Sequence, residues 1–365
     1  MRVALLTYST KPRGGVVHTL ALAEALVRAG VEVDVWTLAR GGDTGFFRRV
    51  DERVGVRAVP FADLGPEEPF GSRIARSIEV LAAAFAPARA AYDVVHAQDC
   101  LSANAALRSG PVLRTVHHLD TFTTPELVAC HERAVAEPTD LVCVSAAVAA
   151  EVEQGWGRTP TVIPNGVAAD RFEAGAADTV GRRRWRRRLG RYVLAVGGIE
   201  PRKGTLDLLE AFALLRADHP DLRLVLAGGE TLFDYRDYRT AFDVRATELG
   251  VEPDLLGVVE DDALPALVAE AAALSFVSTR EGFGLAALEA LAAGTPVVAR
   301  DLPVLREVLG ETATYAARPD EIAAALDRVL AEPPDPAPGR SLARGFAWDA
   351  AAQAHLELYA GRRPG

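Results

Sequence analysis

The chain has 365 residues, of which 49% are hydrophobic and 25% are charged, a balance typical of soluble globular proteins. This length is long for one domain and sufficient for two, and the net charge of −10 argues against nucleic acid or an anionic membrane as a partner of the whole molecule. Three widely spaced cysteines, Cys100, Cys130 and Cys143, lack C-x-x-C spacing, which argues against a disulfide framework or a zinc site and indicates a reducing compartment.

The first 165 residues alternate short β-rich segments with longer helical patterns. The N-terminal apolar segment is too short for a signal peptide, and no stretch is long enough to span a membrane, so we expect a cytoplasmic protein. Apolar residues at helical spacing predict a helix over 15–30. Strands are predicted at 2–8, 31–37, 93–99, 111–120 and 140–145. This alternation indicates a parallel sheet covered on both faces, with ligands at the carboxyl ends of its strands.

The pattern breaks over 162–190, where a Pro-Asn-Gly turn signal precedes a charged stretch punctuated by glycine. We interpret this segment as an interdomain connection with a leading helix. The seven arginines of "GRRRWRRRLGR" (181–191), around Trp185, favour a solvated helix that packs on the second domain over a contact with an anionic membrane.

After this segment the alternation restarts. Strands are predicted at 191–198, 222–229, 272–278 and 295–300, and helices at 205–217, 284–293 and 319–331. A proline-rich joint over 332–339 precedes a last helix at about 341–359. The sequence therefore predicts two doubly wound α/β domains, each Rossmann-like, that face a central cleft: 1–165, and 166–340 followed by the last segment 341–365.

A strand, a glycine turn and a helix follow one another in "STREGFGLAALEALAAG". A helix start after a glycine turn offers free N–H groups, which suit a phosphate or sugar hydroxyls. Glu281 stands at this turn, and Glu289 lies two turns into an otherwise apolar helix. Because burying an unpartnered carboxylate is costly, Glu289 is expected to bond ligand hydroxyls or to pair with an arginine. A helix cap with one internal ion pair is the alternative.

The same order of elements recurs in "VGGIEPRKGTLDLLEAF", where Arg202 and Lys203 stand at the turn. Two cations at a turn between a strand and a helix could bind a diphosphate. The alternative interpretation is a basic turn that only faces solvent. Only two lysines occur in the chain, Lys11 and Lys203, and all other basic residues are arginine. Where arginine is the rule, a lysine in a glycine loop suggests a need for a compact ammonium.

Histidines mark a third candidate site, in "TVHHLD" at a strand end. His117 or His118 could bond a sugar hydroxyl, and His96 and Asp99 end the preceding strand as further acceptor-side candidates. The glycine loop after the first strand lacks the dinucleotide-binding fingerprint, which weakens an oxidoreductase interpretation. No D-x-D motif and no histidine–cysteine ligand spacing appears, so we expect no metal and no cofactor.

Taken together, these stretches resemble family 4 of the retaining glycosyltransferases, which have the GT-B fold. The resemblance covers nearly the whole chain: Gly14-Gly15, "TVHH", "VSAAV", "VIPNGV", "EPRKG", "LVLAGG" and "EGFGLAALEALAAGTPVVA" occur in the family's order. The resemblance implies that 1–165 binds the acceptor, that 166–340 binds a nucleotide-sugar, and that 341–365 crosses back to the first domain.

The resemblance also implies roles for single residues. Glu281 would contact the transferred sugar, Glu289 the ribose hydroxyls, and Arg202 and Lys203 the leaving diphosphate. Backbone groups of the glycine turns would serve the sugar and phosphates, and His117, or alternatively His118, would lie over the reacting sugar. The glycine-turn residues concerned are Gly15, Gly197, Gly282, Phe283, Gly284 and Leu285.

One position departs from the family's pattern: Gly198 stands where many members have arginine. The resemblance implies metal-independent transfer of a hexose from a UDP- or GDP-sugar to an unidentified acceptor hydroxyl, by front-face attack. A GT-B scaffold that binds the nucleotide-sugar without transfer is the first alternative, and an NAD-dependent oxidoreductase is the second.

Overall fold

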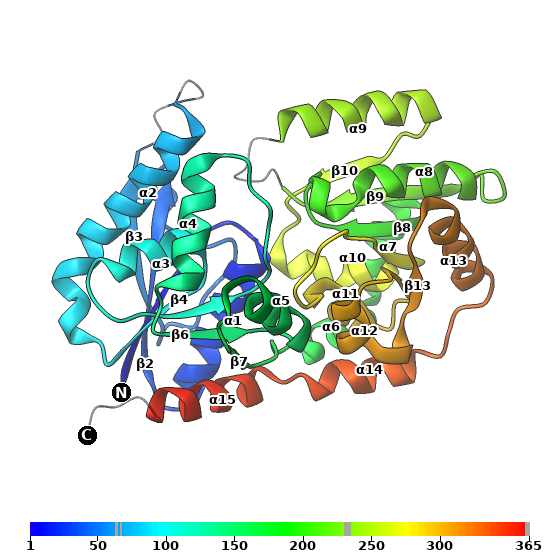
Figure 1. Ribbon diagram of the computed structural model, residues 1–365. Helices are drawn as coiled ribbons and strands as arrows, with labels where there is room; N and C mark the ends of the chain where they lie inside the picture. The colour runs from blue at the N-terminus through cyan, green and yellow to red at the C-terminus, as the bar shows by residue number, and fades with distance from the viewer. Residues whose placement is uncertain (63–64, 66–67, 230–234, 362–365) are drawn as a thin grey trace. The chain divides into compact units, whose positions relative to one another are not determined.

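The computed structural model describes residues 1–62, 65, 68–229 and 235–361 (Figure 1). The chain forms two compact units. The first comprises Met1–Gly166 together with the C-terminal segment from Ala347, and the second comprises Val167–Phe346.

The first unit is built on a parallel sheet that, in the described residues, has seven strands in the order β3-β2-β1-β4-β5-β6-β7. Its strands are β1 (Arg2–Leu6), β2 (Glu32–Arg40), β3 (Gly55–Phe61), β4 (Val94–Ala97), β5 (Leu113–Val116), β6 (Asp140–Cys143) and β7 (Thr161–Val162). Its helices are α1 (Gly14–Arg28), α2 (Phe70–Phe85), the 3-10 helix η1 (Ala86–Ala91), α3 (Cys100–Leu107), α4 (Pro125–Ala136), α5 (Ala146–Trp156) and α15 (Trp348–Ala360).

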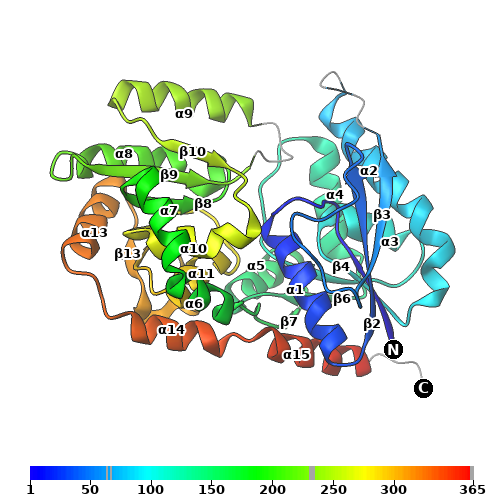
Figure 2. The same cartoon turned by 180° about the vertical axis from the view of Figure 1, so that it is seen from behind.

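Helices cover both faces of this sheet because the strand residues alternate between two apolar faces. Val3 and Leu5 of β1 pack into the core under α1 and α15, whereas Ala4 and Leu6 pack into the core under α2 and α3. Figure 2 shows α1 and α15, from opposite ends of the chain, side by side. The C-terminal segment therefore completes the hydrophobic core of the first unit.

The second unit is built on a parallel sheet with six strands in its described part, in the order β10-β9-β8-β11-β12-β13. Its strands are β8 (Arg191–Val196), β9 (Leu222–Ala227), β10 (Asp254–Gly257), β11 (Ala273–Phe276), β12 (Val297–Arg300) and β13 (Thr314–Ala316). Its α-helices are α6 (Ala169–Ala177), α7 (Thr179–Leu189), α8 (Thr205–Leu215), α9 (Arg236–Leu249), α10 (Leu264–Glu270), α11 (Leu285–Ala293), α12 (Pro303–Leu309), α13 (Pro319–Ala331) and α14 (Pro336–Gly345). Short 3-10 helices are η2 (Pro201–Lys203), η3 (Asp261–Ala263) and η4 (Gly310–Thr312).

Two groups of helices pack in the second unit. Leu208, Phe242 and Ile322, from α8, α9 and α13, share one core with Val193 of β8 and Val298 of β12. Helices α6, α7, α10, α11 and α14 pack on one another as a second group. In this doubly wound arrangement, β8 and β11 are adjacent and the segments that follow them meet at one edge of the sheet.

The predicted strands are present, but most end earlier than expected. The strand expected over 111–120 spans only Leu113–Val116, and the two histidines lie in the loop beyond it. Four strands were absent from the sequence prediction: β3, β7, β10 and β13. β7 has two residues and β13 has three, too few for a clear hydrophobic pattern, and β3 contains Pro60 and alternates irregularly.

The single last helix predicted over 341–359 is wrong, because the chain forms α14 and α15 with a break at Phe346 and Ala347. α14 begins inside the proline-rich joint, where Pro336 occupies the first turn and Asp335 caps the helix. At the break, the Phe346 carbonyl accepts a hydrogen bond of 2.7 Å from the Val167 N–H. That bond fixes a non-helical conformation where Gly345 already weakens the helix.

The arginine-rich stretch forms α7, which is preceded by a separate helix α6 where a single leading helix was expected. Trp185 and Leu189 are buried, and Arg182 and Arg186 both pair with Glu270. Most of the other arginines of this stretch face solvent, as predicted for a solvated helix that packs through its apolar side. Among the described residues, no helix is long and apolar enough to cross a membrane.

Gly166 provides a test of how tightly the C-terminal segment packs in the first unit. A Cβ at this position would lie 2.4 Å from the Trp348 backbone nitrogen, so Gly166→Ala should lower the free energy of unfolding by about 1–3 kcal/mol. Gly155→Ala is the matched control, because a Cβ there meets no atom within 4 Å and alanine favours the helix α5. Thermal denaturation should show a lower Tm for Gly166→Ala only; equal Tm values would contradict this packing.

Candidate active site

The segment after β8 turns sharply before α8 begins, and a glycine makes this turn possible. Gly204 has φ of +63°, and a Cβ on it would lie 2.3 Å from the Val277 carbonyl oxygen. Only glycine fits both requirements. The turn η2 that carries Arg202 and Lys203 is therefore pressed against the end of β11.

The segment after β11 is joined to this turn by further contacts. The Thr279 N–H donates to the Arg202 carbonyl at 2.8 Å. Arg300, only 8% exposed, donates to the Val277 carbonyl from Nε at 3.1 Å and from Nη2 at 2.9 Å, and pairs with Asp207 of α8. The sequence analysis missed this role of Arg300, for which an arginine that ends the apolar strand "TPVVAR" is the available signal.

These contacts bring together the two cations and the first glutamate of the sequence prediction. One carboxylate oxygen of Glu281, Oε2, lies 3.2 Å from Lys203 Nζ and 3.3 Å from Arg202 Nη1. Arg202 Nη2 also lies 3.8 Å from Glu200. All three paired side chains keep 14–20% of their surface exposed, so a ligand can still reach them. Burial lowers the pKa of Lys203, and the nearby Glu281 charge opposes that shift.

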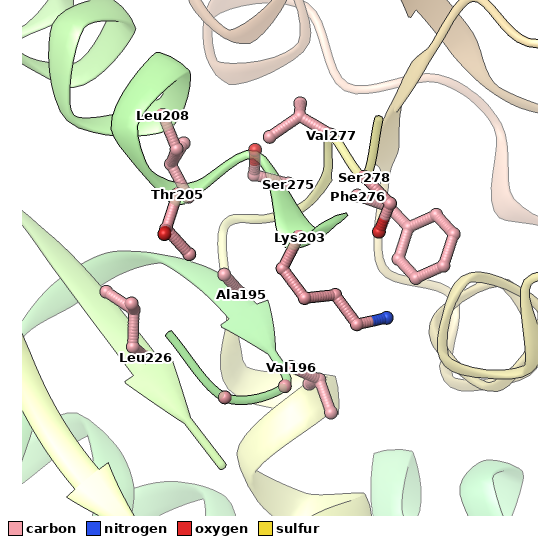
Figure 3. Close-up of a pocket in the computed structure, with 12 residues that line it drawn as sticks. Ala195, Val196, Lys203, Thr205, Leu208, Leu226, Ser275, Phe276, Val277 and Ser278 are labelled. Atoms are coloured by element: carbon pink, nitrogen blue, oxygen red, sulfur yellow. The ribbon is translucent and has the colours of Figure 1, made fainter. Parts of the chain in front are cut away.

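Lys203 lies at a small pocket at this edge of the sheet (Figure 3). Figure 3 shows its extended side chain, with the ammonium between the Val196 and Phe276 sides of the pocket. The ammonium lies 5.4 Å from the Phe276 ring centroid. The pocket is lined by Ala195, Val196, Gly197, Gly198, Lys203, Thr205, Leu208, Leu226, Ser275, Phe276, Val277 and Ser278. Gly198 thus lines the pocket without adding a charge.

The glycine turn before α11 leaves the start of that helix open. Gly284 has φ of +99° at the N-cap position, and no side chain caps the helix. The Phe283 ring is buried against Phe346, with ring centroids 5.4 Å apart. The first N–H groups of α11, from Leu285 on, consequently lack a side-chain acceptor, an arrangement that suits an anion or hydroxyl groups.

Glu289 of α11 has surroundings unlike those of Glu281. Among the described residues it makes no hydrogen bond or ion pair, and Arg171, a cation near it, pairs with Asp261 at 2.9 Å. Burial raises the pKa of Glu289 to about 7, opposed by Arg171 and reinforced by Asp261. The internal ion pair considered as the alternative for Glu289 is therefore not formed.

In the first unit, Gly15 and His117 lie together. A Cβ on Gly15 would be 3.4 Å from His117 Cδ2, a close approach between α1 and the loop after β5. Burial lowers the pKa of His117 to about 3, so the ring is neutral, and its Nε2 has no hydrogen-bond partner in the described structure. His118 Nε2 instead contacts Asp120 at 2.8 Å. The sequence does not decide whether His117 or His118 is the candidate site residue, and the structure gives the two side chains different surroundings.

The other two candidates of this unit have interior or capping contacts. His96 is 0% exposed, and its ring nitrogens contact the Tyr359 hydroxyl at 2.8 Å and the Thr115 hydroxyl at 2.7 Å. This geometry argues against the predicted acceptor contact of His96. Asp99 caps α3 by accepting from the Ser102 N–H at 2.8 Å, and also accepts from the Tyr8 N–H at 3.0 Å.

His18 of α1 is a further buried residue that the sequence analysis missed. Its ring lies 4.6 Å from the His117 ring, edge to face, and its Nδ1 contacts Asn165 Oδ1 at 2.8 Å. Because an amide oxygen only accepts, Nδ1 carries the proton, and burial lowers the pKa of His18 well below its ordinary value. A polar residue on the apolar face of the helix is the signal that could have identified it.

Comparison with known proteins identifies the chain. The family described as "Glycosyltransferase Family 4" matches residues 12–171, and "Glycosyl transferases group 1" matches residues 183–341. A D-inositol 3-phosphate glycosyltransferase of Salinispora arenicola is 32% identical, over 98% of this chain and 91% of that protein. This chain belongs to glycosyltransferase family 4.

Other similarities agree with that assignment. A glycogen synthase of Mycobacterium tuberculosis is 30% identical, and the match covers 100% of this chain and 96% of the glycogen synthase. The crystal structure of HepE from Anabaena, in complex with UDP and glucose, superposes with a TM-score of 0.79 at 22% identity, covering 99% of this chain and 100% of HepE. The predicted α/β architecture with two Rossmann-like domains, the GT-B fold, is confirmed, and the protein is a glycosyltransferase.

The raised pKa of Glu289 makes a prediction for the ligand-free enzyme. Between pH 4.5, the ordinary value, and about 7, the folded state binds more protons than the unfolded state, so stability falls as pH rises. Glu289→Gln removes this loss, and its Tm should exceed that of the wild type increasingly from pH 5 to pH 8. A Tm difference independent of pH, measured by scanning calorimetry at both pH values, would contradict the raised pKa.

Proposed function

We propose that this glycosyltransferase transfers a hexose from a UDP- or GDP-linked sugar to an acceptor hydroxyl, with retention of configuration and without a metal ion. The observation that carries the proposal is the contact of Glu281 with both Arg202 and Lys203, the second of which lines a strand-end pocket. The same unit also carries Glu289, which has no partner among the described residues. The complex of HepE with UDP and glucose and the glycosyltransferase names of the relatives support it.

Arg202 and Lys203 are proposed to bind the donor diphosphate, together with the open N–H groups at the start of α11. Without a ligand, Glu281 is the anion that contacts both cations. A diphosphate that binds the cations competes with this carboxylate, which then becomes available to accept hydrogen bonds from sugar hydroxyls. Glu281 thereby helps to distinguish an intact nucleotide-sugar from the bare nucleotide.

Glu289 is proposed to accept hydrogen bonds from the ribose hydroxyls. Its side chain has no protein partner among the described residues and stays partly exposed, so that ligand hydroxyls can reach it. Two hydroxyl donors would satisfy the carboxylate and favour its charged form. Ligand binding should consequently lower the pKa of Glu289 from its value of about 7.

Gly15 and His117 of the first unit are proposed to contact the reacting sugar. The neutral His117 ring has an unpartnered Nε2, which can bond a hydroxyl without a fixed charge. His118 is already held by Asp120, so it is the weaker candidate. The acceptor itself stays unidentified.

Catalysis in this proposal consists of positioning and charge stabilisation. The acceptor hydroxyl attacks the anomeric carbon from the side of the leaving diphosphate, whose oxygen takes the hydroxyl proton. Arg202 and Lys203 stabilise the negative charge that develops on that diphosphate. The uncharged Gly198 favours a second candidate, a protein that binds the donor without transfer, and only product formation separates the two.

A donor screen tests the proposed reaction. The protein should release nucleoside diphosphate from one UDP- or GDP-hexose in the presence of EDTA, and NMR should show a product anomer with the configuration of the donor. A cell-extract fraction or polyol panel can supply acceptors, with donor hydrolysis as the fallback signal. Turnover abolished by EDTA, or inversion of configuration, would contradict the proposed mechanism, and nucleotide binding without turnover would favour the second candidate.

Lys203 provides a sharper test of the diphosphate contact. Lys203→Ala should lower turnover by about 10²–10³-fold, as for loss of one preorganised electrostatic group. Lys203→Arg should fold normally and bind the nucleotide within a few-fold, yet lose most transfer activity, because a guanidinium is wider and directs its hydrogen bonds differently. The matched control is Lys11→Arg, since Lys11 is 58% exposed in a surface pair with Asp43. Full activity of Lys203→Arg would show that charge alone suffices.

A further inference from the structure

The three cysteines, which are far apart in the sequence, surround one buried guanidinium. Arg114 of β5 is 4% exposed, and its Nε and Nη1 have no hydrogen-bond partner in the described structure. Burial lowers the pKa of Arg114, and Cys100, Asp99, Cys130 and Cys143 are the nearby groups that oppose that shift. An unsatisfied buried cation is costly, so Arg114 favours a negative charge among these neighbours.

Two of these cysteines are neighbours in the fold. Cys100 is the first residue of α3, and Cys130 lies in α4, which packs on α3. One nitrogen, Nδ2 of Asn104, lies 2.8 Å from the Cys100 carbonyl, 2.7 Å from the Cys130 carbonyl and 3.4 Å from Cys130 Sγ. The Cys100 side chain beside the Cys130 thiol, together with burial, raises the pKa of that thiol.

The two thiols differ in access to solvent. Cys100 is partly exposed, whereas Cys130 is 3% exposed and Cys143 is 0% exposed. A small oxidant therefore meets Cys100 first, with the protonated Cys130 thiol behind it. Cys100 lies at the N-terminal end of α3 and near the Arg114 guanidinium, and reactive thiols of other proteins have similar surroundings.

We propose that Cys100 and Cys130 form a redox-modifiable pair that hydrogen peroxide converts to a disulfide. The Cys100 thiolate attacks one peroxide oxygen, the O–O bond breaks, and hydroxide leaves as water once protonated, so that Cys100 becomes a sulfenic acid. The Cys130 sulfur then attacks the Cys100 sulfur, and the S–O bond breaks with release of a second water. Peroxide is reduced and the two thiols are oxidised. This inference does not depend on the proposed glycosyl transfer.

Mass spectrometry can detect this bond directly. The reduced full-length protein is treated with hydrogen peroxide under native conditions, free thiols are blocked with N-ethylmaleimide, and the protein is digested with trypsin. Cleavage after arginine places Cys100, Cys130 and Cys143 on three different peptides, 90–108, 115–133 and 134–158. We expect a covalent link between the first two peptides that dithiothreitol removes. Peroxide-treated protein with all three thiols blocked, or with Cys100 only overoxidised, would overturn the proposal.

Single substitutions locate the pair. Cys130→Ser should abolish the link and leave Cys100 as sulfenic or higher oxides, whereas the matched control Cys143→Ser should form the link as the wild type does. Circular dichroism checks that both variants fold. A link to Cys143 in place of Cys130, or equal loss of the link in both folded variants, would overturn the assignment of the pair.

Arg114→Met tests the role of the cation. Loss of a neighbouring opposite charge should slow peroxide oxidation of Cys100 by roughly tenfold, followed as the decay of the thiol that maleimide can label. Folded Arg114→Met protein with the wild-type oxidation rate would overturn the role of Arg114 in activating the pair.

Discussion

The backbone carbonyl of Val277 is the point on which the geometry around Lys203 and Glu281 depends. Arg300 donates to it twice, and Gly204 approaches it so closely that no side chain fits between them. Two strand-to-helix turns that lie about 75 residues apart in the sequence are thereby held against each other. Lys203 and Glu281 meet because each stands beside this contact. The charged groups of the site are thus positioned by backbone packing more than by their mutual attraction.

The two glutamates of this unit show that different surroundings give the same type of side chain different partners and a different pKa. Glu281 contacts two cations, whereas Glu289 has no partner among the described residues and has a pKa raised to about 7. A free carboxylate in such surroundings is unfavourable until donors arrive. The helix α11 therefore carries a carboxyl group whose charged form a ligand with two adjacent hydroxyls would stabilise.

Much of this arrangement could be predicted from the sequence, for identifiable reasons. The alternation of β-rich and helical segments predicts the two parallel sheets, and the glycine turns after "RYVLAV" and "AALSF" predict where ligand-binding groups collect. The pairing of Glu281 with Arg202 and Lys203 could not be predicted, because it depends on the order β8-β11 in space.

Other features depend on contacts that no local pattern encodes. The break between α14 and α15 depends on the hydrogen bond from the Val167 N–H to the Phe346 carbonyl. In the sequence, Gly345 alone gives only a weak signal for a helix end there. His96 ends a strand, as a ligand-binding residue would, but its side chain faces Tyr359 from the far end of the chain. In the same way, the wide spacing of the cysteines conceals that all three lie near Arg114.

The scarcity of lysine gives the protein a built-in chemical reporter. Amine-reactive acylating reagents have only Lys11, Lys203 and the N-terminal amine to modify. Lys11 is 58% exposed on the surface, whereas Lys203 is 18% exposed and its pKa is lowered, which increases the fraction of nucleophilic free amine. The ratio of acylation at Lys203 to acylation at Lys11 in the same molecule therefore measures whether a ligand covers the pocket at Lys203, without any engineered label.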